Sequence, residues 1–269
     1  SDAQIEWVVA AYVLAFALGL LPFGRLGDIV GRSRMFLIGV AAFTLASALC
    51  GLAPSIEMLI GARVLQGLGG AMMTPQVLAI ATVTFPPHER GQAFSLFGLS
   101  AGLASVCGPV LGGLLIDAQL FGLDWQPIFL VNIPIGIAAI IAGWFLIPRL
   151  PGHAELRNDY AGIALFGLGI VAVVFPIIEG RALDWPVWSF AMMAAGLSLL
   201  VVFYFWQKRR ARAGQPQLLN YDLLANRDYM FGAFIVTVFA SGIPGFFLVI
   251  SLLLQSGFGF TPLQSGLTN

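Results

Sequence analysis

The chain has 269 residues, of which 59% are hydrophobic and only 10% are charged, whereas soluble domains carry about 25% charged residues. A soluble fold of this length could not bury so much apolar surface, so the composition excludes an ordinary soluble protein and indicates a membrane protein. The formal net charge is zero, so no general attraction to nucleic acid is expected.

Apolar segments that are long enough to cross a bilayer recur along the chain. One crossing needs about 20 apolar residues, and eight segments qualify. In chain order they are Ile5–Phe23, Met35–Leu52, Ile56–Thr84, Gln92–Ile116, Ile128–Ile147, Tyr160–Ile178, Trp188–Trp206 and Tyr229–Gln255. We therefore expect an all-α integral membrane protein with about eight transmembrane helices.

The basic residues between these spans fall almost entirely on one side of the membrane. Eleven of the 13 lie in alternate loops, Arg181 lies on the opposite side, and Arg63 lies inside a span. Lys and Arg favour cytoplasmic loops. The loops predicted to be cytoplasmic contain Arg25–Arg34, Arg90, Arg149–Arg157 and Lys208–Arg227. Both ends of the chain are then expected to face outward, and both resemble cuts rather than natural termini.

The first of these loops is rich in glycine and charge. Its distinctive residues are Gly24, Gly27, Asp28, Gly31, Arg32 and Arg34. The three glycines permit a tight turn between two antiparallel helices. Asp28 lies four residues before Arg32 and comes within reach of it if the segment coils. The plainer alternative is a glycine turn whose arginines only set the topology.

The third span contains an arginine about 10 Å inside its start, at about 1.5 Å rise per residue. An intramembrane arginine costs about 2.5–3.5 kcal/mol on insertion scales, so it normally faces the bundle interior or a wet cavity. Helical periodicity places Arg63 on one stripe with four polar or small residues. These are Gln66, Gly67, Gly70 and Thr74. The stripe predicts a helix that lines an aqueous cavity; the alternative is that Arg63 reaches to the membrane surface.

The next two spans contain residues that shape helices. The fourth span holds Gly108, Pro109, Gly112 and Gly113. The GxxxG spacing permits close helix packing, and the proline bends the helix; alone, these residues indicate a close-packed, kinked helix. In the fifth span, Asn132 is expected to make an interhelical hydrogen bond, with direct contact to a ligand as the alternative.

Residues that would support catalysis are absent from the sequence. None of the 13 carboxylates lies near the centre of a span, and no metal-ligand spacing, nucleophile–base constellation or phosphate loop occurs. We therefore expect no enzyme, no metal site and no cofactor. The absent membrane carboxylate also matters for transport, because a proton-driven carrier normally needs a buried acid that titrates.

Three segments together resemble the major facilitator superfamily, specifically its fourteen-helix drug/proton antiporter branch. Gly24–Arg34 resembles the signature between its second and third helices, G-x-L-x-D-x-x-G-R-x-R, with Ile29 where a basic residue is usual. Leu59–Ala71 is similar to the fourth-helix signature. Ala104–Gly113 is similar to the fifth-helix antiporter signature, with Ala104 in place of the leading glycine. Two further similar segments are Trp7–Tyr12 and Phe129–Gly136.

The resemblance implies a division of the chain. Residues 1–147 would form the N-terminal transport bundle, corresponding to helices two to six of the family. Residues 148–207 would form two additional linking helices, residues 208–228 a basic cytoplasmic linker, and residues 229–269 the start of the C-terminal bundle. The first family helix, which usually carries a membrane aspartate, would precede this chain.

The resemblance also implies a function. The protein would be a proton-coupled efflux transporter of drugs or other amphipathic compounds, working by alternating access in a bacterial cytoplasmic (inner) membrane. Its partners would be a small-molecule substrate, protons and the lipid bilayer, and the full-length protein would be a monomer. The alternatives are a metabolite carrier of the same superfamily, for an amino acid, a sugar or a siderophore, and a membrane receptor or scaffold.

Individual roles follow from the same resemblance. Arg63 and Gln66 would serve proton coupling by tuning the pKa of an acid in the first family helix. The loop around Asp28 would latch the two halves on the cytoplasmic side, and Gly108–Gly113 would bend and tighten the fifth helix and so limit leak. The candidates for lining the cavity are Tyr12, Gly67, Gly70, Thr74 and Asn132.

Overall fold

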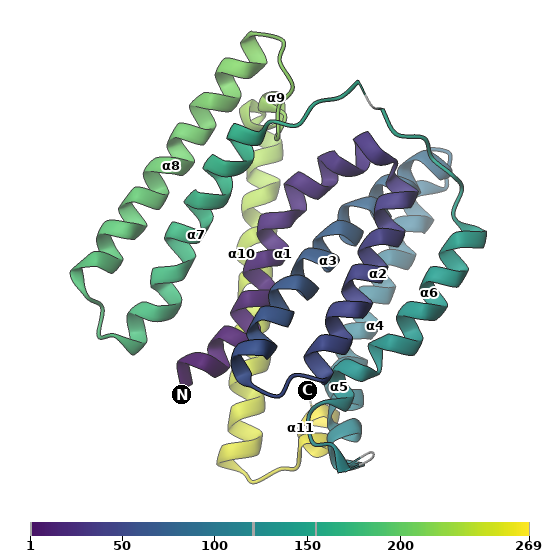
Figure 1. The fold of residues 1–269 in the computed structure, drawn as a ribbon, viewed down its shortest axis with the longest axis vertical. Coiled ribbons are helices and arrows are strands. Elements are labelled where there is room, and N and C mark those ends of the chain that lie inside the picture. The colour runs from purple at the N-terminus through teal and green to yellow at the C-terminus, as the bar shows by residue number, and fades with distance from the viewer. Residues whose placement is uncertain (1, 120–121, 154, 269) are drawn as a thin grey trace. The chain divides into compact units, whose positions relative to one another are not determined.

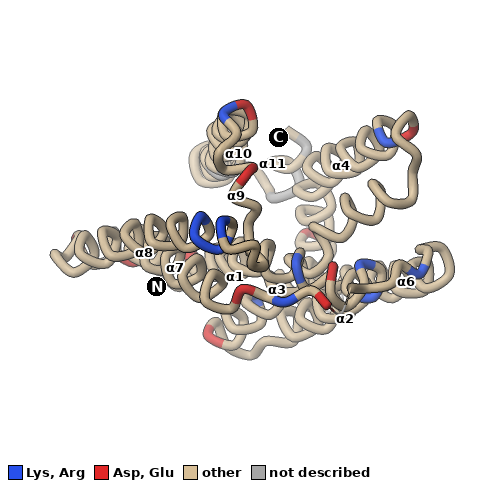
Figure 2. The backbone as a smooth tube through the Cα atoms, turned by 90° about the horizontal axis from the view of Figure 1, so that it is seen from above, with Lys and Arg blue, Asp and Glu red and all other residues tan. Residues whose placement is uncertain are grey.

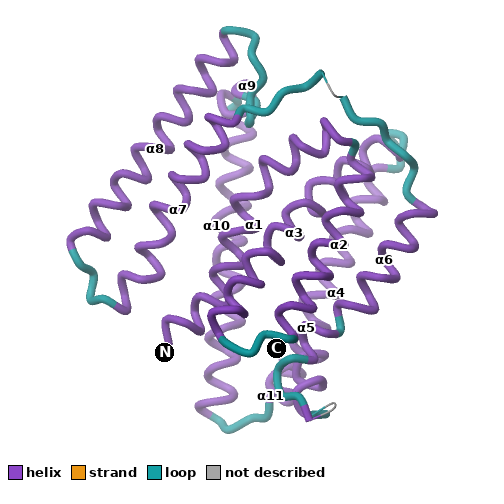
Figure 3. The backbone as a smooth tube through the Cα atoms, viewed as in Figure 1, coloured by secondary structure: helices purple, strands orange, loops and turns teal. Residues whose placement is uncertain are grey.

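A computed structural model describes residues 2–119, 122–153 and 155–268 of the chain. These residues form helices and loops, and no strand occurs among them (Figure 3). Eight helices in the described part are long and apolar enough to cross a membrane, which confirms the number expected from the sequence. In Figure 2 most of the backbone is tan, and the segments coloured for charge lie mainly near helix ends.

The described residues form two compact units, and the first takes the chain up to Thr84 together with Asn132–Tyr221. Its helices are α1 (Asp2–Val30), α2 (Arg32–Gly51), α3 (Ile56–Thr84), α6 (Asn132–Leu146), α7 (Tyr160–Ala182) and α8 (Val187–Arg212). Within this unit, α3 packs against both α1 and α2, α6 packs against α2, and α7 packs against α1 and α8 (Figure 1).

The second unit takes Phe85–Val131 and the chain from Asp222 onward. Its elements are α4 (Arg90–Asp117), α5 (Pro127–Leu130), α10 (Arg227–Leu252), the π-helical turn η2 (Leu253–Gly257) and α11 (Pro262–Thr268), while α9 (Tyr221–Ala225) begins at the boundary. Within this unit, α4 packs against α5 and α11. The division of the chain at residues 147, 207 and 228, which rests on the family resemblance, stays a prediction.

Helix α3 approaches both of its neighbours closely because glycines face them. A Cβ atom on Gly67 would collide with the backbone carbonyl of Tyr12 in α1, and one on Gly69 would lie 2.6 Å from the amide nitrogen of Phe43 in α2. Small residues let helix backbones approach in a membrane, where van der Waals packing drives association. Helix α3 therefore forms the centre of the first unit.

The loop predicted after the first span is mostly helix. Helix α1 continues to Val30, and only Gly31 separates it from α2. Gly24 and Gly27 lie within α1, so the prediction that they form a turn is wrong; Gly27 is buried against the side chain of Gln76 in α3. Gly31 alone makes the break, with a φ of 108° that residues with a side chain rarely adopt.

The predicted fifth span, Ile128–Ile147, is interrupted near its start. Helix α5 ends at Leu130, and α6 begins at Asn132. Pro134 has no amide hydrogen to donate to the Leu130 carbonyl, which would be its partner in a continuous helix. The interruption at Val131 therefore lies next to the carbonyl that the proline leaves without its usual helical partner.

Candidate functional site

Arg63 lies at the centre of a polar cluster between α1 and α3. Its Nε donates to the Val8 carbonyl of α1 at 2.9 Å, and its Nη1 donates to the side-chain oxygen of Gln66 at 2.7 Å. Its guanidinium carbon lies 4.2 Å from the centroid of the Tyr12 ring, within the range of a cation–π interaction. The side chain therefore points toward α1 inside the bundle, and not along the route to the membrane surface.

Gln66 extends the cluster from α3 to α2 and α6. This residue is 2% exposed, and its Nε2 donates to the Ser47 hydroxyl of α2 at 2.9 Å. The side chain of Asn132 in α6 donates to the same hydroxyl at 3.0 Å, which confirms the predicted interhelical hydrogen bond. Lipid cannot satisfy buried polar groups, so such bonds hold helices together in a bilayer. The cluster joins four helices: α1, α2, α3 and α6.

The remaining residues of the predicted stripe lie along the same side of α3. Gly67 and Gly70 are buried against α1, where a Cβ atom on Gly70 would lie 3.2 Å from the Tyr12 hydroxyl. Thr74 donates to the carbonyl of Gly70 in its own helix at 3.0 Å. The structure thus brings the stripe and Tyr12 together as a helix contact; the role of these residues and Asn132 in lining a cavity stays a prediction.

At the end of α1, Asp28 and Arg32, which their spacing places within reach of each other in a coiled segment, form an ion pair. The Nε of Arg32 donates to the Asp28 carboxylate at 3.0 Å, and its Nη1 donates to the Ala79 carbonyl of α3 at 3.1 Å. The two side chains are 31% and 32% exposed, so water screens the pair and its own contribution is at most about 1 kcal/mol. The pair ties the junction of α1 and α2 to α3.

A cavity of about 640 Å³ lies beside this junction within the first unit. Gly24, Arg25 and Asp28 line it, together with residues 214–218 of the segment that follows α8. The segment predicted as a charged linker therefore borders the segment predicted as a gate. Gating by either one stays a prediction.

In the second unit, α4 is helical throughout and includes Pro109. Pro109, Gly112 and Gly113 line a cavity of about 280 Å³. A Cβ atom on Gly266 of α11 would lie 2.6 Å from the Pro109 carbonyl, so α11 approaches α4 at this point. Among the described residues, nothing lies within 4 Å of a Cβ atom on Gly108 or Gly112, and the close packing expected of these two glycines stays a prediction.

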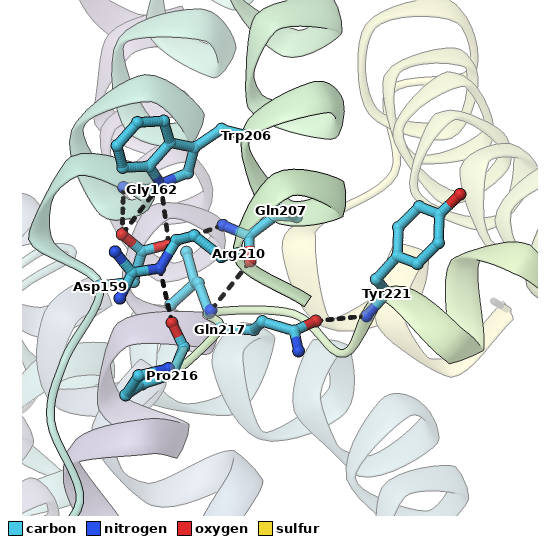
Figure 4. A network of polar contacts seen from close by, with 9 residues as sticks. Asp159, Gly162, Trp206, Gln207, Arg210, Pro216, Gln217 and Tyr221 are labelled. Carbon is cyan, nitrogen blue, oxygen red and sulfur yellow. Dashed lines mark hydrogen bonds and ion pairs between the residues drawn. The ribbon is translucent and has the colours of Figure 1, made fainter. Parts of the chain in front are cut away.

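A second buried polar cluster, which the sequence reasoning missed, lies where α7 begins and α8 ends. Asp159 is 2% exposed and caps α7 by accepting from the Gly162 amide at 2.9 Å. Its carboxylate also accepts from the Trp206 indole at 3.1 Å and from the Gln207 side chain at 2.8 Å. Arg210 completes the cluster, with its Nε 3.6 Å from the carboxylate. Figure 4 shows these side chains converging on the single carboxylate.

The same cluster holds the segment that follows α8. The Nε of Arg210 donates to the Pro216 carbonyl at 2.7 Å, and the side-chain oxygen of Gln207 accepts from the Leu218 amide at 3.1 Å (Figure 4). Gln207 is fully buried. The chain therefore folds back over the end of α8 and is fixed there by two polar side chains.

The sequence of the chain is similar to those of known membrane transporters. The family model described as Major Facilitator Superfamily matches residues 1–161. The chain is 43% identical over 268 residues to a probable actinorhodin transporter of Streptomyces coelicolor, with coverage of 100% of the chain and 46% of the relative. It is 31% identical over 268 residues to the tetracenomycin C resistance and export protein of Streptomyces glaucescens, with coverage of 99% and 48%. The chain thus spans about half the length of the curated relatives it matches.

A solved structure is also similar. It is the crystal structure of a bacterial homolog of the human lysosomal transporter Spinster, in an inward-facing and occupied conformation. The TM-score is 0.50 and the sequence identity is 20%, with coverage of 99% of this chain and 64% of that chain. At this identity the likeness concerns the fold alone, and it confirms the helix bundle expected from the sequence.

Proposed function

The chain belongs to the major facilitator superfamily, and from this premise we propose that it forms part of a proton-coupled exporter of drugs or other amphipathic compounds. It is a multi-pass membrane protein with eight candidate spans among its described residues. One relative is named as a probable actinorhodin transporter and another as a tetracenomycin C resistance and export protein. These names support export of an organic compound and agree with the expectation of a transporter rather than an enzyme.

The observation that carries the proposal is the arginine held inside α3. A cation in an apolar span is costly unless polar groups compensate for the loss of water, and Val8, Tyr12 and Gln66 surround this guanidinium. A fixed cation favours the charged form of a nearby acid. In the proposed cycle, Arg63 and Gln66 therefore couple the protonation of a carboxyl group, supplied by the rest of the protein, to the rocking of two helix bundles.

The other predicted segments have places in the same cycle. The ion pair of Asp28 and Arg32 latches the cytoplasmic side, supported by its bond to α3. The small residues of Gly108–Gly113 allow a neighbouring helix to pack closely against α4, and this close packing limits the leak of ions through the protein. The substrate moves along a cavity between the bundles, and the whole protein is a monomer.

The proposal predicts proton-linked efflux. Cells that express the full-length protein should accumulate several-fold less of a cationic dye, such as ethidium, than cells with an empty vector, and a protonophore should remove the difference. In inverted membrane vesicles, the dye should dissipate a pre-formed proton gradient. Efflux that persists after the gradient is collapsed would contradict proton coupling. Absence of efflux for every dye, combined with altered growth on amino acids, sugars or siderophores, would instead indicate a metabolite carrier.

The proposal also assigns a side of the membrane to each loop. In a bacterial cytoplasmic membrane, the loops rich in arginine should lie inside the cell. Alkaline phosphatase, which is active only outside the cytoplasm, should be inactive when fused after Arg210 and active when fused after Trp185. Trp185 lies just before α8 and Arg210 lies in its last turn, so each serves as the control for the other. The opposite pattern would reverse the assigned topology.

A further inference from the structure

Two arginines from distant parts of the sequence line one cavity of the first unit, where α2 begins and α6 ends. The cavity measures about 500 Å³. Its lining includes Arg34, Leu37, Trp144, Ile147 and Arg149. Both arginines are exposed, whereas Leu37 and Ile147 are partly buried and form an apolar wall. The cavity therefore combines two cations with an apolar surface.

Ser33 links the two segments that carry these arginines. This residue is 6% exposed and directly precedes Arg34. Its hydroxyl donates to the Pro148 carbonyl at 2.6 Å and accepts from the Leu150 amide at 3.3 Å. The backbone on both sides of Arg149 is thus bonded to the start of α2. These two hydrogen bonds fix the segment that carries Arg149 against the start of α2, where Arg34 lies.

Trp144 marks this end of α6 as a boundary between lipid and water. The residue is 63% exposed, and the guanidinium carbon of Arg149 lies 5.9 Å from the centroid of its ring. Indole rings prefer the level of the lipid headgroups. The neighbouring Phe145 and Leu146 are 80% and 79% exposed, so the outer surface of α6 is apolar here. A ligand with an anionic head and an apolar tail matches these features.

We propose that this cavity binds the phosphate group of an anionic phospholipid. Each guanidinium can donate two parallel hydrogen bonds to phosphate oxygens, and basic pockets between transmembrane helices on the cytoplasmic side are suited to lipid headgroups. Of the described residues that line the cavity, none is Asp or Glu, so no carboxylate within the lining neutralises the two cations. An acyl chain lies against Leu37 and Trp144. The site is independent of the proposed proton coupling.

Native mass spectrometry of the full-length protein in detergent tests the proposal. Phosphatidylglycerol should bind the wild type in preference to phosphatidylcholine. The double variant Arg34→Gln/Arg149→Gln should lower the affinity for phosphatidylglycerol about thirtyfold and leave binding of phosphatidylcholine unchanged. The matched control is Arg209→Gln/Arg212→Gln, which removes the same charge from exposed positions in the last turn of α8 and should bind as the wild type does.

A third variant separates loss of charge from loss of fold. Arg34→Lys/Arg149→Lys keeps both charges and should recover most of the affinity, and thermal unfolding checks that every variant is folded. The proposal is overturned if the glutamine variant binds phosphatidylglycerol as tightly as the wild type, or if the control loses as much affinity. It is also overturned if inorganic phosphate alone displaces the lipid at equal concentration, because the site would then bind a free anion.

Discussion

Replacing Arg63 with alanine should abolish proton-linked efflux while the protein still folds into the membrane. The substitution removes the only charge described in the middle of α3 and, with it, the bonds to Val8 and Gln66 and the contact with Tyr12. Gln66 keeps its bond to Ser47, and the glycine contacts between α3 and α1 remain, so the bundle should hold. An acid that depends on this cation would titrate in a different pH range, and the link between proton movement and efflux would be lost.

Two measurements on the same membranes decide this outcome. The first is the rate at which the dye dissipates a proton gradient in vesicles. This rate should fall in Arg63→Ala to that of membranes without the protein, and Arg63→Lys should keep part of the wild-type rate. The second is thermal unfolding, which should stay close to that of the wild type. The control Arg212→Ala removes an exposed arginine at the end of α8 and should retain full coupling. If Arg63→Ala shows unchanged pH-dependent efflux, the role assigned to Arg63 is wrong.

The largest loss of stability is expected for Asp159→Ala, at about 3–5 kcal/mol, because breaking a buried ion pair leaves the partner charge without compensation. Arg210 is 18% exposed and would lose its carboxylate, while the buried Gln207 and the Trp206 indole would each lose an acceptor. Helix α7 would also lose its N-cap, which is worth about 1 kcal/mol and is part of the same total. In detergent, the midpoint of thermal unfolding should fall by roughly 10 °C.

Two further variants isolate the origin of that loss. Glu155→Ala removes a carboxylate whose side chain is 75% exposed, in the same loop, and should shift the midpoint little. Replacing Asp159 and Arg210 together with apolar residues of similar volume should recover part of the stability, since the uncompensated charge is gone. A midpoint for Asp159→Ala equal to that of Glu155→Ala would show that the cluster does not stabilise the fold.

Much of the helical framework was predictable because apolar spans and the residues at their ends mark the helices in the sequence. Helix α3 begins and ends at the predicted residues, Ile56 and Thr84. Ser55 directly precedes it, and its hydroxyl accepts from the Met58 amide at 3.3 Å, as an N-cap residue does. The end of α1 was not predictable in this way. Glycines weaken a helix without ending it. Helix α1 continues past Gly24 and Gly27 because α3 supports it there: the Gln76 side chain donates to the Phe23 carbonyl at 2.9 Å.

The candidate site was predictable only where its members are close in the sequence. Arg63 and Gln66 are three residues apart on one helix, so their spacing predicted a shared stripe, and the structure adds a hydrogen bond between them. Asp159 lies directly before an apolar span, with Gly162 three residues further on, and this pattern could have indicated an N-cap. Its ion pair with Arg210 spans about 50 residues and depends on how α7 packs against α8. The short helices α9 and α11 are too brief to produce a periodic pattern.

Hydrogen bonds connect α1, α2, α3 and α6 through the residues Val8, Arg63, Gln66, Ser47 and Asn132. If one of these helices slid by a single turn, about 5.4 Å, the bonds that it makes to its neighbours would break together in a medium that offers no replacement. Interhelical hydrogen bonds in membranes contribute about 0.6 kcal/mol each on average, and the glycine contacts of α3 with α1 and α2 resist the same movement. We therefore expect these four helices to move together as one body during transport.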